Sequence, residues 1–235
     1  MFRRPKAPGQ TGRGLVYDQL VPELRGVITD WGGVMTNPIA DSVNAWLAAD
    51  RIDRASYTAV MRRWVMQAYG DDGDQNPIHA LERGECTNDE FELALARELV
   101  LESGGSVDGP GLLARMFAGS VLDEPMLELF RKLHADGVPT GLLSNSWGGA
   151  YPQELFPDMF DAVVISSEVG MRKPEARIFR HAAELLGLTP QECIFIDDIE
   201  ANITAAERLG FTGVLHSAAD HTAERVGELL GFRLG

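Results

Sequence analysis

Charged and polar residues stand at or just beyond the ends of four short apolar segments. They are Asp30 after residues 27–29, Ser144 and Asn145 after 138–143, Lys173 at the expected start of the helix that follows 162–165, and Asp197 with Asp198 after 193–196. A carboxylate can attack phosphorus and form an aspartyl phosphate, which splits one hard hydrolysis into two easier steps. The attacked group is itself negative, so a divalent cation must neutralise both, and oxygen ligands select Mg²⁺. These residue types together have the composition of a phosphoryl-transfer site.

Each member of this set has a chemical task that suits its side chain. Asp30 is the candidate nucleophile, and with Asp198 or Asp197 it would form the Mg²⁺ site. Lys173 and the Ser144 hydroxyl would hold the equatorial phosphoryl oxygens as negative charge spreads in the transition state. We therefore expect all four chain segments to meet in one crevice.

The elements that would position these residues alternate between strand and helix. Short apolar runs at 27–29, 138–143, 162–165, 193–196 and 212–215 read as buried strands, and most are separated by helical patterns at 126–135, 174–186 and 201–209. Strand–helix alternation predicts an α/β fold with a doubly wound parallel sheet. Ligands of such sheets bind beyond the carboxyl ends of the strands, which is where the polar residues fall.

The stretch between the first two predicted strands has a different pattern. Val60, Met61 and Trp64 recur with a helical period, residues 87–90 form a capping-box motif, and no convincing strand is visible. We predict an all-helical cap over 38–118, inserted into an α/β core. The core would comprise residues 21–37 and 119–235, after a flexible tail over residues 1–20 that is basic and rich in Gly and Pro.

Composition limits the partners of this chain. The net charge of -14 opposes binding to nucleic acid and to anionic lipid, so we expect a small phosphorylated metabolite as the partner, with neither nucleic acid nor membrane. No apolar stretch approaches the roughly 18 residues that span a bilayer. Two separated cysteines, Cys86 and Cys193, fit a reducing compartment, and we expect a cytoplasmic location. The sequence leaves open whether the chain forms a homodimer.

Four segments in this order and spacing resemble the haloacid dehalogenase-like superfamily, in particular the subgroup with the phosphatase domain of soluble epoxide hydrolase. The segments are VITDWGGVMT (27–36), LLSNSW (142–147), SSEVGMRKPEARIF (166–179) and FIDDIEANITAAERLG (195–210). One such motif is weak evidence for a family, but four in this order are a specific match. They cover the core from about residue 26 to 215. The resemblance implies a Rossmann-like core with a helical cap that closes over the site and selects substrate.

The resemblance also implies a role for each matching residue. Asp30 matches the nucleophile, Ser144 and the adjacent Asn145 the phosphoryl-binding pair, and Lys173 the lysine that steadies the intermediate. Asp198 matches a Mg²⁺ ligand with Asp197 as its close companion, and Asn202 matches a residue that orders this acidic loop. The family's further metal contact is a backbone carbonyl, which Gly32 can supply.

Gly32 is also where the chain departs from the family. Most phosphatases of the family carry there a second aspartate that protonates the leaving oxygen, and general acid–base help of this kind is worth about 10² to 10⁴ in rate. A cap residue, bound water or the substrate can replace it, or the substrates have good leaving groups. The alternative is a non-catalytic phosphate-binding or regulatory protein. Haloacid dehalogenases also lack this aspartate, but they use no metal, so Asp197 and Asp198 argue against dehalogenation.

Several other residues have competing interpretations. Trp64 is predicted to be core, whereas Trp31 and Trp147 adjoin the catalytic loops and are candidates to border the substrate. Arg62 and Arg63 read as a solvated helix face rather than an anion site. The five histidines show no metal-ligand spacing.

Overall fold

The computed structural model describes residues 23–67, 76–148 and 151–231, so the predicted tail over 1–20 lies outside the described residues. The strands are β1 (Gly26–Thr29), β2 (Thr140–Ser144), β3 (Ala162–Ile165), β4 (Cys193–Asp197) and β5 (Thr212–Leu215). The α-helices are α1 (Ile39–Ala49), α2 (Arg54–Gln67), α3 (Pro77–Glu82), α4 (Asn88–Glu98), α5 (Leu112–Met116), α6 (Glu124–Ala135), α7 (Ser166–Val169), α8 (Ala176–Leu185), α9 (Glu200–Glu207) and α10 (Ala219–Leu230). Two 3₁₀ helices, η2 (Gln153–Asp158) and η3 (Pro190–Glu192), complete the order.

The five strands form one parallel sheet in the order β3-β2-β1-β4-β5. The chain moves outward from β1 to β2 and β3, and then crosses back to the other side of β1 for β4 and β5. The strand order therefore reverses between β1 and β4, and crevices at such reversals are the usual ligand sites of open α/β sheets. Thr29 pairs with Ile196, so Asp30 and Asp197 follow at the same level on these neighbouring strands.

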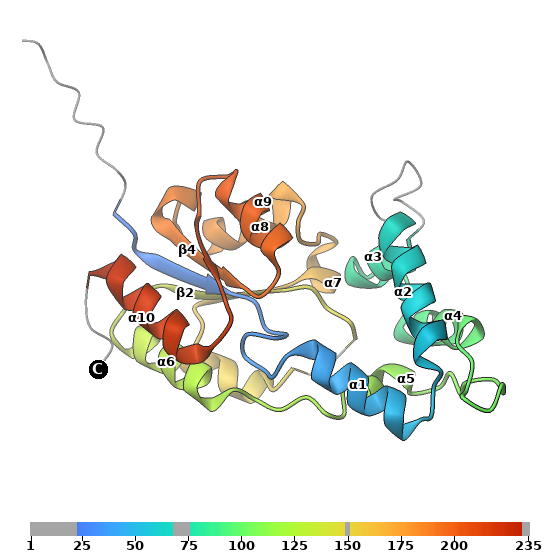
Figure 1. Ribbon diagram of the computed structural model, residues 1–235. Helices are drawn as coiled ribbons and strands as arrows, with labels where there is room; N and C mark the ends of the chain where they lie inside the picture. Colours follow the sequence, from blue (N-terminus) through green and yellow to red (C-terminus); the bar gives the residue numbers. More distant parts are fainter. Residues whose placement is uncertain (1–22, 68–75, 149–150, 232–235) are drawn as a thin grey trace, which may run out of the picture.

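Both faces of the sheet are covered, which explains why its central strands β1, β2 and β4 are wholly buried and mainly apolar. Successive strand residues point to opposite faces. Val27, Leu142 and Ile194 thus pack with residues of α6 and α10, whereas Ile28, Leu143 and Phe195 pack with residues of α8 and α9. Figure 1 shows these two helix pairs on opposite sides of the strands. This arrangement confirms the predicted doubly wound α/β class.

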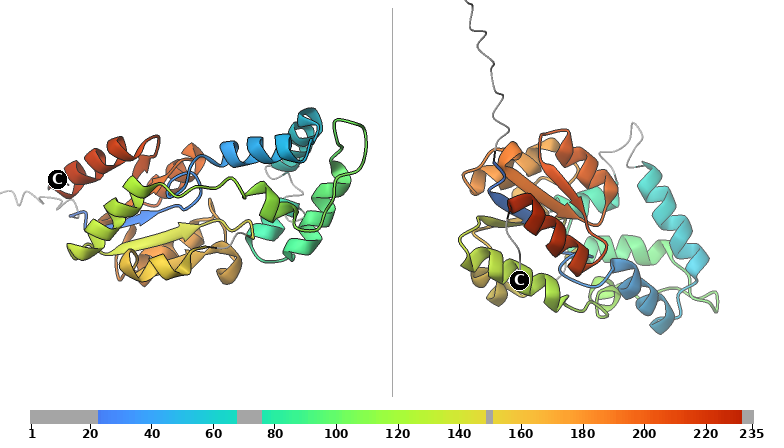
Figure 2. Two further views of the ribbon diagram at one scale, coloured as in Figure 1. Left: turned by 90° about the horizontal axis from the view of Figure 1, so that it is seen from below. Right: turned by 60° about the vertical axis from the view of Figure 1, so that its left-hand side comes forward.

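The chain between β1 and α6 contributes α1 to α5, so its described part is helical, as predicted. Between α1 and α5 it contains two isolated bridges, Ile52–Leu101 and Val100–Ser106, but no strand among its described residues. Its own apolar cluster includes Trp64 and Phe91, both buried. Thr87 and Glu90 form the predicted capping box at the start of α4. The five helices lie as a separate lobe beyond the end toward which β1 points, as two further views also show (Figures 1 and 2).

Two adjacent linkers join this helical lobe to the sheet. Thr36 and Leu122 form an antiparallel bridge, and the Asn37 side chain bonds to the backbone of Gly119 and Val121. The lobe therefore leaves and re-enters the sheet domain at one place. The exact division at residues 37/38 and 118/119 stays a prediction.

Two local predictions differ from the structure. Pro174 does not begin the helix after β3, because Glu175 is its N-cap with an extended ψ of 129° and α8 starts at Ala176. Sequence reasoning also missed α10, which begins without a side-chain cap and so gives no start signal. Gly187 and Gly210, which directly follow the predicted helices 174–186 and 201–209, have φ values of +68° and +102°, a conformation that glycine allows at helix ends. None of the helices among the described residues combines the length and apolarity needed to cross a bilayer.

Candidate active site

The carboxyl ends of three neighbouring strands bring the predicted residues together. Asp30 continues the β1–β4 ladder by donating its backbone N–H to the Ile196 carbonyl at 2.9 Å. Asp197 ends β4 and Ser144 ends β2. All three are nearly fully buried, with Asp30 7% exposed. The parallel register thus places groups more than 50 residues apart in sequence at one edge.

Lys173 reaches this edge from the loop between α7 and α8, not from the start of a helix as predicted, because α8 begins only at Ala176. Its ammonium lies 2.9 Å from Asp30 Oδ1 and 2.6 Å from Asp197 Oδ2, and it is 1% exposed. Asn145 fixes this loop by accepting the Lys173 backbone N–H at 2.8 Å and donating to the Lys173 carbonyl at 3.1 Å. Asn145 therefore positions Lys173, which the sequence could not show.

The electrostatics of this cluster leave negative charge in excess. Burial raises the pKa of Asp30 to about 7, with Lys173 opposing this shift and Asp197 adding to it. Burial acts to lower the pKa of Lys173, but Asp197 and Asp30 outweigh it, and the net pKa is raised. Lys173 thus stays an ammonium. With Asp198, three carboxylates face one ammonium, so two negative charges lack a counterion among the described residues.

Part of the Asp198 carboxylate has no partner among the described residues. Its Oδ1 is buried and has no hydrogen-bond partner among the described residues, and burial raises its pKa. One oxygen each of Asp30, Asp197 and Asp198 lies within 4.8 Å of the others, the only group of this kind in the described part of the chain. Buried orphan carboxylate oxygens cost free energy unless paired or bound to metal. The donor set therefore fits a hard divalent ion such as Mg²⁺.

The two neighbouring aspartates are used differently. Asp197 accepts hydrogen bonds from Ile199 N at 2.8 Å and from Asn202 Nδ2 at 3.1 Å, besides its contact with Lys173. Its oxygens are therefore already engaged by protein groups, and its role as a companion of the metal ligand Asp198 stays a prediction. Asp198 packs on Gly33, where a Cβ atom would lie 2.3 Å from Asp198 Oδ2. Gly33 also has φ +79°, so both this contact and the backbone conformation disfavour a side chain there.

Gly32 leaves space that is filled by another residue. A Cβ atom at position 32 would meet Ile39 Cδ1 at 2.9 Å, at the start of α1. Ile39 is apolar and cannot act as an acid. The structure therefore offers no direct replacement for the missing aspartate at this point, and the metal contact of the Gly32 carbonyl stays a prediction.

Tyr151 is a site residue that sequence reasoning missed. Its hydroxyl lies 2.9 Å from the Ser144 Oγ, and burial raises its pKa. Its ring packs edge-on against Trp31, with ring centroids 5.9 Å apart. No spacing signal marks a tyrosine seven residues beyond a strand end, so only the fold reveals it.

A cavity of about 660 Å³ adjoins these loops and extends toward the helical lobe. Trp31, Ser144 and Asn145 line it from the sheet side, and Trp147 lines it as predicted from the sequence. Arg62 and Arg63 do not line it. Arg63 is half-exposed and pairs with Glu98 at 2.9 Å, as expected of a solvated face.

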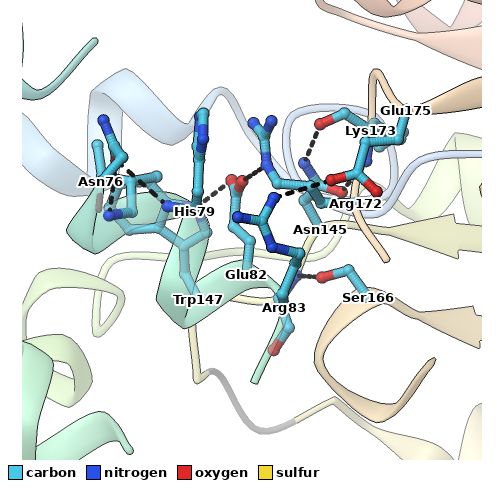
Figure 3. A network of polar contacts seen from close by, with 12 residues as sticks. Asn76, His79, Glu82, Arg83, Asn145, Trp147, Ser166, Arg172, Lys173 and Glu175 are labelled. Carbon is cyan, nitrogen blue, oxygen red and sulfur yellow. Dashed lines mark hydrogen bonds and ion pairs between the residues drawn. The ribbon is translucent and has the colours of Figure 1, made fainter. Parts of the chain in front are cut away.

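A second missed residue, Glu82 on α3, ties the helical lobe to the catalytic loops. Its carboxylate accepts from Trp147 Nε1 at 2.9 Å and pairs with Arg172. Beside it, Arg83 pairs with Glu175 at 2.9 Å. Figure 3 shows Glu82 and Arg83 facing the loop that carries Arg172 and Lys173. A buried acid in a short amphipathic helix has no distinctive sequence signal.

Comparisons with known proteins agree with this geometry. The model of the haloacid dehalogenase-like hydrolase family matches residues 14–210. A phosphatase of Mycobacterium tuberculosis is 28% identical over 214 residues, which are 86% of this chain and 92% of that protein. Bifunctional epoxide hydrolase 2 of Sus scrofa is 24% identical over 90% of this chain. The chain spans 40% of the length of that relative, and 19% to 33% of other long relatives.

A solved structure extends the comparison to a bound state. A HAD family enzyme of Bacteroides thetaiotaomicron, in complex with magnesium and inorganic phosphate, is 25% identical to this chain with a TM-score of 0.60. The match covers 83% of this chain and 95% of that one.

Proposed function

Because this chain belongs to the haloacid dehalogenase-like hydrolases, we propose that it is a Mg²⁺-dependent phosphatase that hydrolyses small phosphomonoesters through a phosphorylated Asp30. The observation that carries the proposal is the convergence of Asp30, Asp198 and the Lys173–Asp197 pair at one edge of the sheet. The mycobacterial phosphatase and the magnesium and phosphate complex of the Bacteroides relative support it.

In the first step, Asp30 attacks phosphorus and the alcohol oxygen departs. Lys173 lies 2.9 Å from the attacking carboxylate, so it can hold a phosphoryl oxygen while it keeps Asp30 ionised. The Ser144 hydroxyl is positioned by Tyr151 to donate to a second oxygen. Mg²⁺ held by Asp30, Asp198 and the Gly32 carbonyl would supply charge neutralisation between the nucleophile and the phosphoryl group.

In the second step, water cleaves the acyl phosphate, and Asp30 is restored. With Gly32 in place of an acid, no carboxyl at this position can protonate the leaving oxygen. We therefore propose a leaving-group bias: aryl, acyl or anomeric phosphates should be hydrolysed faster than simple alkyl phosphates. Equal rates for these classes at matched KM would instead reveal an acid elsewhere in the site.

The same Gly32 favours a second candidate, a phosphate-binding or regulatory protein without turnover. This candidate predicts Mg²⁺-dependent thermal stabilisation by phosphorylated ligands but no hydrolysis across a broad panel. Two free thiols, Cys86 and Cys193, support the further proposal of a reducing, cytoplasmic location.

Hydrolysis of p-nitrophenyl phosphate with Mg²⁺ separates these candidates. We expect turnover that EDTA removes and that Asp30→Asn abolishes, while Asp136→Asn, an exposed aspartate at the end of α6, keeps full activity. Hydrolysis that survives both EDTA and Asp30→Asn would refute the mechanism. Binding without turnover would favour the second candidate.

A further inference from the structure

The cavity beside the strand-end loops is positioned to hold the part of a substrate that is not phosphate. It is continuous with Ser144 and Asn145 on the sheet side, and its volume of about 660 Å³ lies within the usual range of small-ligand sites. A phosphoryl group seated between Asp30 and Ser144 would therefore direct its ester substituent into this space. The chemistry of the remaining wall decides what that substituent can be.

The wall on the side of the helical lobe is largely apolar and aromatic. It includes Val43, Tyr57, Leu113, Met116, Phe117 and Trp147. Phe117 and Trp147 pack edge-on with centroids 6.5 Å apart, so the surface is held in place by its own packing. Such a wall stabilises an apolar substituent by removing it from water.

The wall carries two acids whose lone pairs are already engaged. Glu82 pairs with Arg172 and accepts from Trp147, as Figure 3 shows. Glu92 accepts the backbone N–H groups of Gly111 at 2.7 Å and Leu113 at 2.9 Å. Neither carboxylate is available to recognise a cationic group on a ligand without losing these partners.

No described residue that lines the cavity is Lys, Arg or His. The two internal stretches outside the described ranges, 68–75 and 149–150, contain none of these residue types in the sequence either. Lys173 is committed to Asp30 and Asp197 at the phosphoryl end. A second anionic group on the substrate would thus enter a space whose described lining holds two carboxylates and offers no cationic side chain, which is unfavourable.

We propose that the cavity selects by charge: the substrate is a phosphate monoester of an uncharged, mainly apolar alcohol or phenol, and monoesters that carry a second anionic group are rejected. This inference rests on the proposed function, because it assigns the phosphoryl end to Asp30. It excludes sugar bisphosphates, nucleoside diphosphates and phosphorylated carboxylic acids as good substrates.

A matched pair of aryl phosphates tests the charge filter. 4-Carbamoylphenyl phosphate and 4-carboxyphenyl phosphate have nearly the same size, and only the second carries a further negative charge. We expect kcat/KM to favour the carboxamide by at least about tenfold, since like charges brought together across an interface are costly. Equal values, or a preference for the carboxylate, would overturn the proposal.

A charge-introducing variant separates the charge effect from the leaving-group effect. Ala114 lines the cavity and is exposed on α5, so Ala114→Arg adds a cation without disturbing the core. We expect this variant to raise kcat/KM for the carboxylate severalfold and to narrow the preference. The matched control Ala135→Arg adds the same charge at an exposed position on α6, away from the cavity, and should leave the preference unchanged. Equal shifts in both variants would contradict a filter in the cavity.

Binding of non-hydrolysable analogues distinguishes failure of this inference from failure of the proposed function. With Mg²⁺ present, 4-carbamoylbenzyl phosphonate should raise Tm at lower concentration than 4-carboxybenzyl phosphonate. This difference without any turnover would refute the phosphatase proposal but keep the filter. Turnover combined with equal binding of the two phosphonates would refute the filter and keep the phosphatase.

Discussion

Gly33→Ala is a small change that should disable the cation site through one contact. A Cβ atom at position 33 would lie 2.3 Å from Asp198 Oδ2 and 2.9 Å from its Cγ, so the carboxylate must leave its present position beside Gly33. The new side chain also sits at φ +79°, where a left-handed conformation costs a non-glycine residue about 1–2 kcal/mol. We expect this loss of stability together with Mg²⁺ affinity weakened about 10- to 100-fold, as when a group that orients a metal ligand is removed.

Gly137→Ala is the matched control for the backbone part of this effect. Gly137 has φ +78°, and nothing lies within 4 Å of its added Cβ. Both variants should therefore lose similar free energy of unfolding in urea titrations with EDTA present. Only Gly33→Ala should lose Mg²⁺ binding, measured by calorimetry and by the Mg²⁺ concentration for half-maximal turnover.

Two outcomes for this pair of variants would contradict the proposed contact between Gly33 and Asp198. If Gly33→Ala binds Mg²⁺ and turns over as Gly137→Ala does, Asp198 does not hold the ion where the structure places its carboxylate. If both variants lose Mg²⁺ binding equally, the effect comes from general destabilisation and not from the contact.

Three further predictions follow from buried groups of the structure. Lys173→Met leaves Asp30 and Asp197 buried without their cation. In the absence of metal it should lower the free energy of unfolding by about 3–5 kcal/mol, and with Mg²⁺ it should show no turnover. Unchanged urea midpoints would contradict this prediction. Glu82→Gln removes the ion pair to Arg172, the neighbour of Lys173, and should lower the free energy of unfolding by about 1.5–3 kcal/mol. It should also reduce kcat more than it raises KM, because Glu82 helps to position the loop that carries Lys173. A change in KM alone would argue against this positioning role. Burial raises the pKa of the Cys193 thiol to about 12. At pH 8 iodoacetamide should therefore modify Cys86 but not Cys193 until the protein unfolds, which peptide mass spectrometry would show. Fast labelling of Cys193 in the native protein would contradict its burial.

The parts of the fold that sequence predicted are those with local signals. Wholly apolar runs such as Cys193–Ile196 marked the buried strands, and the Thr87–Glu90 capping box marked the start of α4. A polar residue at the end of each strand then had to reach the shared edge, because parallel register leaves no other place for it. For this reason Asp30, Ser144 and Asp197 were predictable without any long-range information.

The residues that sequence reasoning missed depend on contacts between distant segments. Tyr151 acts on Ser144 only because the chain beyond β2 folds back over the strand end. Glu82 pairs with Arg172, which lies 90 residues later in the sequence, and neither the residue types nor their spacing predicts this pair. The helix start expected at Lys173 was wrong because the backbone is still extended at Glu175, and α8 begins only at Ala176.

The most direct test of the central claim is to find where the phosphoryl group resides during turnover. After rapid acid quench of the Mg²⁺ enzyme with an aryl phosphate, borohydride reduction converts an acyl phosphate into an alcohol and so tags the residue that carried it. Peptide mass spectrometry should locate the reduced residue at position 30 and find none in Lys173→Met. Turnover with the tag at another residue, or with no tag at any carboxylate under conditions that trap acyl phosphates, would contradict the role of Asp30.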